Sequence, residues 1–380
     1  MRTGRFGAVA LLALAAQFAS ASADPAASVG RVSAQRLQPP PRTFTVAAGG
    51  DILPEGIVNT TAAALAPPGV RYDYAPLFEP IRDIVSWADL AICHMEVPIG
   101  APGEKAGFRG PGAYGSNLVA APYEMAFDLA RVGFNRCSTA SNHSYDLGLT
   151  GIDTTLDALD AAGISHTGTA RTAAEAVPQV FDVNGVKVAH ISVARNSNTG
   201  WPRDEWRLRR AATTANTLVD IATARAAGAE VVIVSLHVFV ELQRAPVADD
   251  RAFVAAITAP GGANLVLVTG PHVVQPVEVV NGALVYWSLG NFISGMGRPD
   301  RGKYADLRTL DELLATVRFT EQPDGGFAAE PWTVLLCKHP TTHVVYPALT
   351  TALDPSLSAD VRGHLEACTD RSSSVVADLR

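Results

Sequence analysis

The sequence predicts an α/β fold in which a parallel or mixed sheet lies between helices. The first observation is a series of short apolar runs separated by longer, helix-like stretches. The runs are continuously apolar rather than alternating, which is typical of strands that are covered on both faces. We predict strands at residues 44–50, 88–95, 134–141, 186–193, 230–237 and 264–269.

The second observation is helical spacing between the predicted strands. Residues 151–162 carry Ile152, Leu156 and Leu159 at intervals of four and three, which places all three on one helix face. Residues 214–227 follow a similar pattern, and each segment is followed by a glycine, a common residue at the C-terminal end of helices. We therefore predict a helix over each segment.

The third observation is the Asn281-Gly282 pair within the β-rich stretch 276–287. Asn-Gly is a strong signal for a two-residue hairpin, because both central positions adopt positive φ. We therefore expect antiparallel strands here and a sheet of mixed direction. Past residue 297 the pattern weakens, and two further strands are predicted at 313–319 and 332–338.

The N-terminus has the features of a signal peptide over residues 1–23. Arg2 and Arg5 precede an apolar run at 6–18, and an A-x-A cleavage signal ends at Ala23. The run is shorter than the roughly 20 residues that span a bilayer. We expect a cut near Ala23 and a secreted or extracytoplasmic protein.

The remaining chain is expected to form one large domain after a short arm. Residues 24–42 are rich in Ala and Ser and end in a proline cluster, which indicates a linker or arm. Residues 43–300 form the main domain, and 301–380 add strands and a tail that complete it. No later segment is apolar for long enough to span a membrane. Loss of Arg2 and Arg5 would take the formal charge from −7 to −9, which argues against nucleic acid as a partner.

The four cysteines can pair in three ways in an oxidising compartment. We prefer a bridge between Cys337 and Cys368, because both lie in the C-terminal part of the chain. Cys93 and Cys137 lie inside apolar, strand-like runs. For these two, buried free thiols remain an equal alternative to a bridge.

Polar residues follow the apolar runs at their C-terminal ends. Taken singly, each has an ordinary explanation as a turn, a helix cap or a hydrogen-bonded structural histidine. Their repeated position favours one shared site, because ligands of open α/β sheets bind beyond the carboxyl ends of the strands. Carboxylate, amide and imidazole groups together suit divalent Zn, Mn or Fe. These residues are Asp51, Glu96, Asn142, His143, His237 and His272.

Several motifs in this order resemble the CapA family, the poly-γ-glutamate capsule-synthesis proteins of the calcineurin-like metallophosphatase superfamily. The resemblance covers about residues 44–293 and implies a four-layer αββα sandwich of mixed sheets. The motifs are Gly50-Asp51-Ile52-Leu53, Ala88-Asp89-Leu90 through Glu96, Gly133-Phe134 through Asn142-His143 and Asp146, His237, Pro271-His272-Val273-Val274-Gln275-Pro276 and Ser288-Leu289-Gly290-Asn291-Phe292.

The resemblance also implies roles for individual residues. His143 would protonate a leaving group and Asp146 would orient it. Arg109, His94 and Asn291 would contact the substrate, although Arg109 could equally be an ordinary surface residue. The implied metal ligands are Asp51, Glu96, Asn142, His237 and His272.

The sequence departs from the family pattern at three places. His94 replaces the usual Asn, and it either adds a ligand or packs in the core. Val238-Phe239 replaces Trp-Gly, so the pocket wall differs. Gly270 replaces the first imidazole of a His-Pro-His motif, so we expect one ion, two ions or none, and we expect Gly270→His to raise the metal content.

Two functions follow from this pattern. The first is a metal-dependent hydrolase or transferase acting on poly-γ-glutamate, a related cell-envelope peptide or a phosphoester. The alternative is a metal-poor, non-catalytic protein that binds such an anionic polymer and assists capsule synthesis, export or anchoring, in contact with the capsule-synthesis machinery.

Overall fold

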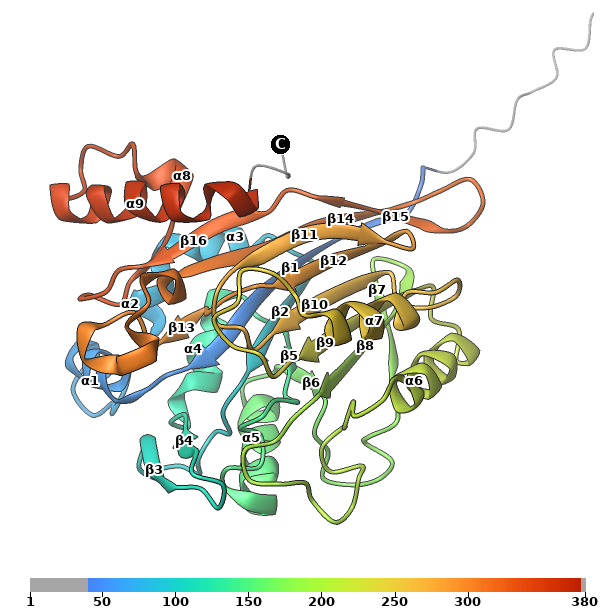
Figure 1. Ribbon diagram of the computed structural model, residues 1–380, viewed down its shortest axis with the longest axis horizontal. Coiled ribbons are helices and arrows are strands. Elements are labelled where there is room, and N and C mark those ends of the chain that lie inside the picture. The colour runs from blue at the N-terminus through green and yellow to red at the C-terminus, as the bar shows by residue number, and fades with distance from the viewer. Residues whose placement is uncertain (1–39, 377–380) are drawn as a thin grey trace, which may run out of the picture. The chain divides into compact units, whose positions relative to one another are not determined.

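The computed structural model describes residues 40–376 (Figure 1). The predicted signal peptide and most of the predicted arm lie outside the described residues. Among the helices of the described part, none has both the length and the hydropathy needed to cross a membrane.

A mixed sheet of nine strands contains both the first strand and the C-terminal strands. Its order is β17-β16-β14-β1-β2-β5-β6, with β13 paired to β1 and β15 paired to β14. Strand β1 is parallel to β2 and antiparallel to β14, so the C-terminal segment is central to this sheet. The strands are β1 (Thr43–Leu53), β2 (Leu90–Met95), β5 (Arg136–Ser138), β6 (Ser165–Thr167), β13 (Ile293–Ser294), β14 (Asp311–Glu321), β15 (Phe327–Pro331), β16 (Val334–Lys338) and β17 (Val345–Pro347).

A second sheet has six strands in the order β11-β12-β10-β9-β8-β7. Strands β8, β9, β10 and β12 are parallel neighbours, while β11 and β12 form the predicted hairpin, with Val280 opposite Ala283. Asn281 and Gly282 have φ values of 52° and 85°, as the Asn-Gly signal requires. The strands are β7 (Val180–Val183), β8 (Val186–Ala194), β9 (Val231–His237), β10 (Leu265–Thr269), β11 (Gln275–Val280) and β12 (Ala283–Ser288).

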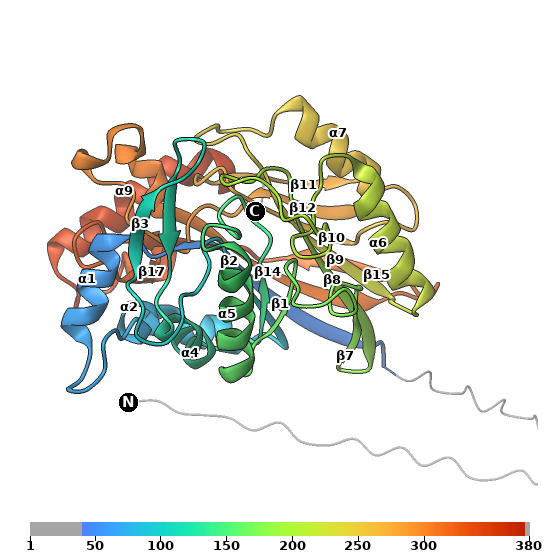
Figure 2. The same ribbon diagram turned by 90° about the horizontal axis from the view of Figure 1, so that it is seen from below.

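Helices cover the outer face of each sheet, and Figure 2 shows the two groups on opposite sides. The nine-stranded sheet is covered by α1 (Gly56–Leu65), α2 (Ala75–Phe78), α3 (Arg82–Ser86), α4 (Glu124–Val132) and α5 (Gly148–Ala161). The six-stranded sheet is covered by α6 (Thr214–Ala226) and α7 (Ala248–Ile257). Both predicted helices are therefore present, as α5 and α6.

A hairpin, short 3-10 helices and the C-terminal helices complete the described part of the chain. Strands β3 (Gly107–Pro111) and β4 (Asn117–Ala120) form the hairpin. The others are η1 (Glu79–Ile81), η2 (Pro299–Ala305), η3 (Leu307–Leu310), α8 (Ala348–Thr351) and α9 (Ala359–Val376).

The buried core explains why the strands are continuously apolar. On β1, Ala47 packs among the helices while Val46 packs between the two sheets. On β9, Val232 packs toward α6 and α7 while Ile233 packs between the sheets. Alternate residues of these two strands thus enter different apolar layers, and both faces of each strand are covered. The expected four-layer αββα sandwich is confirmed.

Two disulfides tie the fold together. Cys337 on β16 is bonded to Cys368 on α9, as predicted. Cys93 and Cys137 are also bonded, so the alternative of buried free thiols is wrong. They are register partners on the adjacent parallel strands β2 and β5, with Cα atoms 4.5 Å apart, a separation that a disulfide can bridge.

Candidate metal centre and cleft

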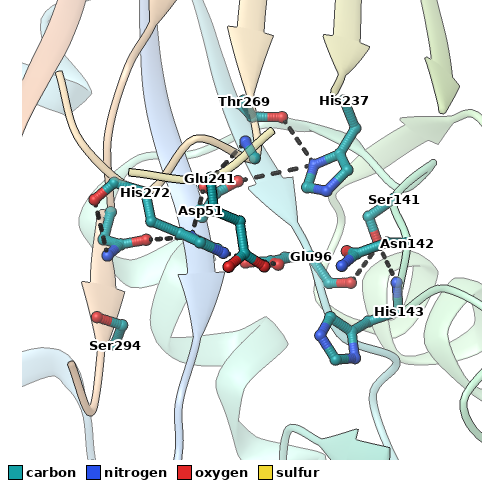
Figure 3. Close-up of polar contacts among 12 residues, drawn as sticks. Asp51, Glu96, Ser141, Asn142, His143, His237, Glu241, Thr269, His272 and Ser294 are labelled. Atoms are coloured by element: carbon teal, nitrogen blue, oxygen red, sulfur yellow. Dashed lines mark hydrogen bonds and ion pairs between the residues drawn. The ribbon is translucent and has the colours of Figure 1, made fainter. Parts of the chain in front are cut away.

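The structure brings the predicted strand-end residues together at one edge of the two sheets (Figure 3). Nδ1 of His272 lies 3.2 Å from Oδ2 of Asp51, and its Nε2 lies 3.8 Å from Oε1 of Glu96. Nδ1 of His237 lies 3.9 Å from Oδ1 of Asp51. Asn142 and His143 line the same cleft as His272. The carboxyl ends of β1, β2, β5, β9 and β10 supply these groups, as expected from the sequence.

A local irregularity of β1 orients Asp51. The register between β1 and β2 shifts between Ala48 and Asp51. Gly50 allows this because a Cβ here would collide with the carbonyl oxygen of Gly290. The backbone N–H of Asp51 donates to that same carbonyl at 2.9 Å, which holds the carboxylate at the edge of the sheet.

Several buried oxygen atoms of the site have no hydrogen-bond partner among residues 40–376. They are Oδ1 of Asp51, both carboxylate oxygens of Glu96 and Oδ1 of Asn142. Leaving such atoms buried and unpaired is costly, and a bound cation would satisfy those oxygens that ligate it. Carboxylate, amide oxygen and imidazole are the ligands of divalent Zn, Mn and Fe, so the residues present fit such a metal.

Burial and the close approach of charges shift the pKa values of the ionisable groups in this site. Burial lowers the pKa of His237 well below its usual range, so its imidazole is neutral and able to act as a ligand. Burial, reinforced by the nearby Asp51 charge, raises the pKa of Glu96 to about 8. Burial opposes ionisation of Asp51 as well, but its hydrogen bond with His272 lowers its pKa overall. Burial opposes protonation of His272, but the charges of Glu96 and Asp51 raise its pKa overall to about 10, so a protonated His272 supplies a positive charge beside these two acids. A metal that binds here displaces the protons of Glu96 and His272.

His143 and Asp146 form a close pair beside these residues. Nδ1 of His143 lies 2.6 Å from Oδ2 of Asp146, and the backbone N–H of Val119 donates to the same oxygen at 2.8 Å. Burial opposes protonation of His143, but the hydrogen bond and charge of Asp146 raise its pKa overall. With Nδ1 held by Asp146, the reactive nitrogen of the ring is Nε2.

The comparison with known proteins establishes the family. The family model of the bacterial capsule synthesis protein PGA_cap matches residues 45–296. The chain belongs to this family. The match includes every strand-end residue of the candidate centre.

Two relatives of this PGA_cap protein come from Bacillus. The PGA biosynthesis protein CapA of Bacillus subtilis (strain 168) is 24% identical over 234 residues, which are 59% of each chain. The capsule biosynthesis protein CapA of Bacillus anthracis is 25% identical over 184 residues, or 47% of this chain and 44% of the relative. The matches thus span less than two thirds of either relative.

Among solved structures, the calcineurin-like phosphoesterase YfkN from Bacillus subtilis is similar to this chain. The TM-score is 0.46 and the sequence identity is 13%, and the match covers 89% of this chain and 100% of that chain.

Two of the three predicted substrate contacts are buried behind the centre instead of facing the cleft. His94 is 2% exposed, and its ring nitrogens contact Ser138 and His237. Asn291 is 1% exposed, and its Oδ1 lies 2.9 Å from Nδ1 of His272. The structure therefore places Asn291 as a residue that orients His272.

The third predicted contact, Arg109, lies outside the lining of the cleft. On β3 its guanidinium donates to Glu104 at 3.3 Å and to the carbonyl of Lys105 at 2.7 Å. Gly107 and Gly110, with φ values of 81° and 124°, shape this part of the hairpin. The side chain is thereby directed toward its own loop rather than toward His143.

The cleft in front of the centre has a volume of about 590 Å³. Its lining reaches the β3–β4 hairpin, the start of α1, and the η2 segment. Arg301 of η2 pairs with Glu55, and Nζ of Lys303 lies 2.7 Å from Glu241. Among the described residues that line this cleft, the basic side chains are those of Arg301 and Lys303.

The sequence analysis missed Asn198 and Glu241, which also line the cleft. Asn198 follows strand β8, and the rule used for the other strand ends would have selected this loop. Glu241 belongs to the loop after β9, where hydrogen bonds from Lys303 and Tyr304 hold its carboxylate. No spacing in the sequence indicated those contacts, because the partners are more than 60 positions away.

Proposed function

We propose that this protein is a metal-dependent hydrolase or transferase that acts on poly-γ-glutamate, a related cell-envelope peptide or a phosphoester. The observation that carries the proposal is the position of the His143–Asp146 pair. His143 lines the same cleft as His272, and Asp146 holds its ring. His272 in turn contacts Asp51 and Glu96, whose Oδ1 and carboxylate oxygens have no hydrogen-bond partner among the described residues. A proton donor next to a cation site is what cleavage of an ester or amide bond requires.

Asp51, Glu96, Asn142, His237 and His272 would hold the metal. When bound, a divalent cation supplies Lewis acidity and lowers the pKa of coordinated water toward neutrality. Asp146 holds Nδ1 of His143 and favours the protonated ring. His143 then donates the proton on Nε2 to the leaving group.

The cleft lining carries two cations, Arg301 and Lys303, and three acids, Glu55, Glu241 and Asp300, so an anionic substrate would bind at the two cations. Arg301 and Lys303 lie on one short segment that faces the centre, and each is held by an acid. A carboxylate or phosphate of the substrate would compete with Glu55 and Glu241 for these cations. The relatives' names, which refer to PGA and capsule biosynthesis, support a γ-glutamyl polymer as the substrate.

The two disulfides support a location outside the cytoplasm, because such bonds persist in oxidising compartments. The basic and apolar N-terminal pattern supports export by a signal peptide cut near Ala23. In that location the protein would meet the polymer and the capsule-synthesis machinery directly.

The test is turnover by the metal-loaded protein, measured with a γ-glutamyl polymer and with a small phosphoester. We expect His143→Gln to retain its metal and to lose activity by about 100-fold or more. Glu96→Gln should lose metal and activity together. His166→Gln is the matched control, because His166 pairs with Asp160 away from the cleft lining. Metal-loaded protein that binds the polymer but turns over neither substrate would establish the non-catalytic alternative instead.

A further inference from the structure

The β3–β4 hairpin contacts both the cleft and the proposed acid. Phe108 and Val119 are opposite each other on its two strands, and both residues line the cleft. We infer that Phe108 binds the methylene groups of the substrate and that this contact positions His143. The link between them is the hydrogen bond from Val119 to Asp146. The inference rests on the proposed function and adds to it a substrate-binding residue and the chemical group that this residue recognises.

Phe108 is an exposed apolar side chain in a cleft whose aliphatic side chains are buried. Its exposed fraction is 52%, whereas the valine, leucine and methionine of the lining are exposed by 7% or less. Covering an exposed phenyl ring with an apolar group removes both from water and is favourable. A γ-glutamyl unit has two methylene groups between its carboxylate-bearing carbon and its amide carbonyl. Its carboxylate would bind Arg301 or Lys303 of the same lining, while its methylene groups cover the ring.

A β-bulge directs Phe108 into the cleft. The register of the two strands shifts between Phe108 and Gly110, so Arg109 is the extra residue of β3. Bulges re-aim side chains and are common next to active sites. The guanidinium of Arg109 turns back to its own loop, while the neighbouring ring lines the cleft. Phe108, one position earlier, thus takes the role predicted for Arg109.

Val119 connects the hairpin to the proposed acid. Its backbone N–H donates to Oδ2 of Asp146 at 2.8 Å, and the same oxygen lies 2.6 Å from Nδ1 of His143. Val119 and Asp146 are buried, so water competes little for this hydrogen bond. Oδ1 of Asp146 has no partner among the described residues. The orientation of the Asp146 carboxylate, and with it that of His143, therefore depends on the position of β4.

The hairpin can shift at a low cost in free energy. It forms a two-stranded sheet of its own, and Figure 1 shows it below the two large sheets. The buried residues of its strands are Gly107, Val119 and Ala120. A two-stranded hairpin with so few buried residues is marginally stable and belongs to the most easily displaced parts of a fold. A substrate that covers Phe108 would hold the opposite residue, Val119, in place.

A purely structural role does not account for the exposure of Phe108. A ring that packed the hairpin onto the domain would be buried, as Phe78 and Phe292 are. Single exposed apolar side chains are common on protein surfaces, and Phe127 on α4 is one, with 38% exposed. Phe127 lies outside the cleft lining, whereas Phe108 lies within it and opposite Val119. Phe127 is therefore the matched control.

The test follows hydrogen–deuterium exchange of the Val119 amide in the Mn²⁺-loaded protein, with and without a saturating γ-glutamyl oligomer. The oligomer should slow this exchange by about 10-fold in wild type, because it holds the hairpin in place. In Phe108→Ala the oligomer should slow the exchange by less than about 2-fold. Phe108→Leu keeps an apolar contact and should restore most of the protection. Phe127→Ala should behave as wild type.

Turnover of the same oligomer tests the link to His143. Phe108→Ala should lower kcat/KM by about 10-fold, since binding energy at the ring is used to position the acid. Val119→Pro removes the backbone N–H, whereas Val119→Ala keeps it. Val119→Pro should lower kcat by about 10-fold with little change in KM, and Val119→Ala should change kcat by less than about 2-fold.

Equal protection of the Val119 amide in wild type and Phe108→Ala would overturn the inference, as would equal kcat values for the two Val119 variants. If Val119→Pro does not fold, the exchange of the Phe108 variants decides the question. Turnover without these effects would refute the inference and leave the proposed function standing. Protection that depends on Phe108, without any turnover, would support the contact and refute the proposed function.

Discussion

The side-chain amide nitrogen of Asn198 lies 3.1 Å from Nε2 of His143, the ring nitrogen that is not held by Asp146. The backbone N–H of Asn198 donates to the carbonyl of Asn142 at 2.8 Å, and its own carbonyl accepts a hydrogen bond from Ser116 at 3.2 Å. Asn198 therefore connects a proposed metal ligand, the proposed acid and the β3–β4 hairpin.

We predict that Asn198 is a positioning residue for His143. Asn198→Ala should lower kcat by about 10-fold, a part of what a general acid contributes, and leave KM and metal content unchanged. It should also raise the pKa of His143 that appears in the pH profile of kcat, because the amide N–H of Asn198 donates to Nε2 only when that nitrogen is unprotonated. Asn196→Ala, two positions earlier in the same loop and outside the cleft lining, is the control. A similar loss in both variants would indicate a general effect on the loop.

The strand-end rule identified the centre because its residues follow the backbone directly. Asp51 lies two residues before the end of β1, His237 ends β9 and Glu96 follows β2, so sheet topology determines that they meet. His94 could not be placed in this way. Whether it faced the cleft or the layer between the sheets depended on the register of β1 and β2, which shifts at the irregularity before Asp51.

The C-terminal part of the fold was only partly predictable. The predicted strand at 313–319 is the centre of β14, but its position next to β1 follows from long-range pairing that no local pattern encodes. The charged lining of the cleft was also missed. Arg301 and Lys303 reach Glu55 and Glu241 across more than 60 positions, and single charges in loops have no periodic signal.

We predict that Arg301 and Lys303 govern affinity for an anionic polymer. Lys303→Ala should raise KM by about 5- to 10-fold with little change in kcat, because it removes a cation and frees the Glu241 carboxylate. The rise in KM should be smaller at high salt, because salt screens the interaction between charges. Arg301→Ala should behave similarly. The control is Lys105→Ala, an exposed lysine outside the cleft lining. An unchanged KM in both cleft variants would show that the polymer binds elsewhere.

We predict that both disulfides form in the exported protein. Peptide mapping without reduction should recover the pairs Cys93–Cys137 and Cys337–Cys368. Their sequence separations of 44 and 31 residues correspond to about 4 kcal/mol of stabilisation each by loop closure. Replacing Cys93 and Cys137 by serine should also weaken metal binding, since His94, next to Cys93 in the chain, contacts the proposed ligand His237. Four free thiols in exported material would contradict the prediction.

Lys338 is a buried cation without an acidic partner among the described residues. Its side chain is 1% exposed on β16, and Nζ donates to the carbonyl of Met296 at 3.2 Å. Burial, with a smaller contribution from the charge of Arg298, lowers the pKa of Lys338 from 10.5 to about 7. The folded protein therefore carries a destabilising charge at neutral and acidic pH.

The sign of the pH dependence follows from proton binding. Between pH 7 and 10.5 the unfolded chain binds a proton at Lys338 that the folded protein does not, so this residue makes stability rise with pH across that range. Below pH 7 the folded protein bears the full free-energy cost of burying the charged Lys338 side chain. Lys338→Met removes the charge and keeps the volume. At pH 6 the free energy of unfolding of the variant should exceed that of wild type by about 5 kcal/mol, less about 1 kcal/mol for the lost hydrogen bond.

Urea unfolding of the two proteins at pH 6, 7.5 and 9 measures this difference, which should shrink at the highest pH. Lys187→Met is the control. Lys187 is 54% exposed and pairs with Asp182, so its replacement should change stability by no more than about 0.5 kcal/mol at each pH. If wild type were the more stable protein at pH 6, Lys338 would have to be neutral or paired in the fold, and the cost assigned to its burial would be refuted.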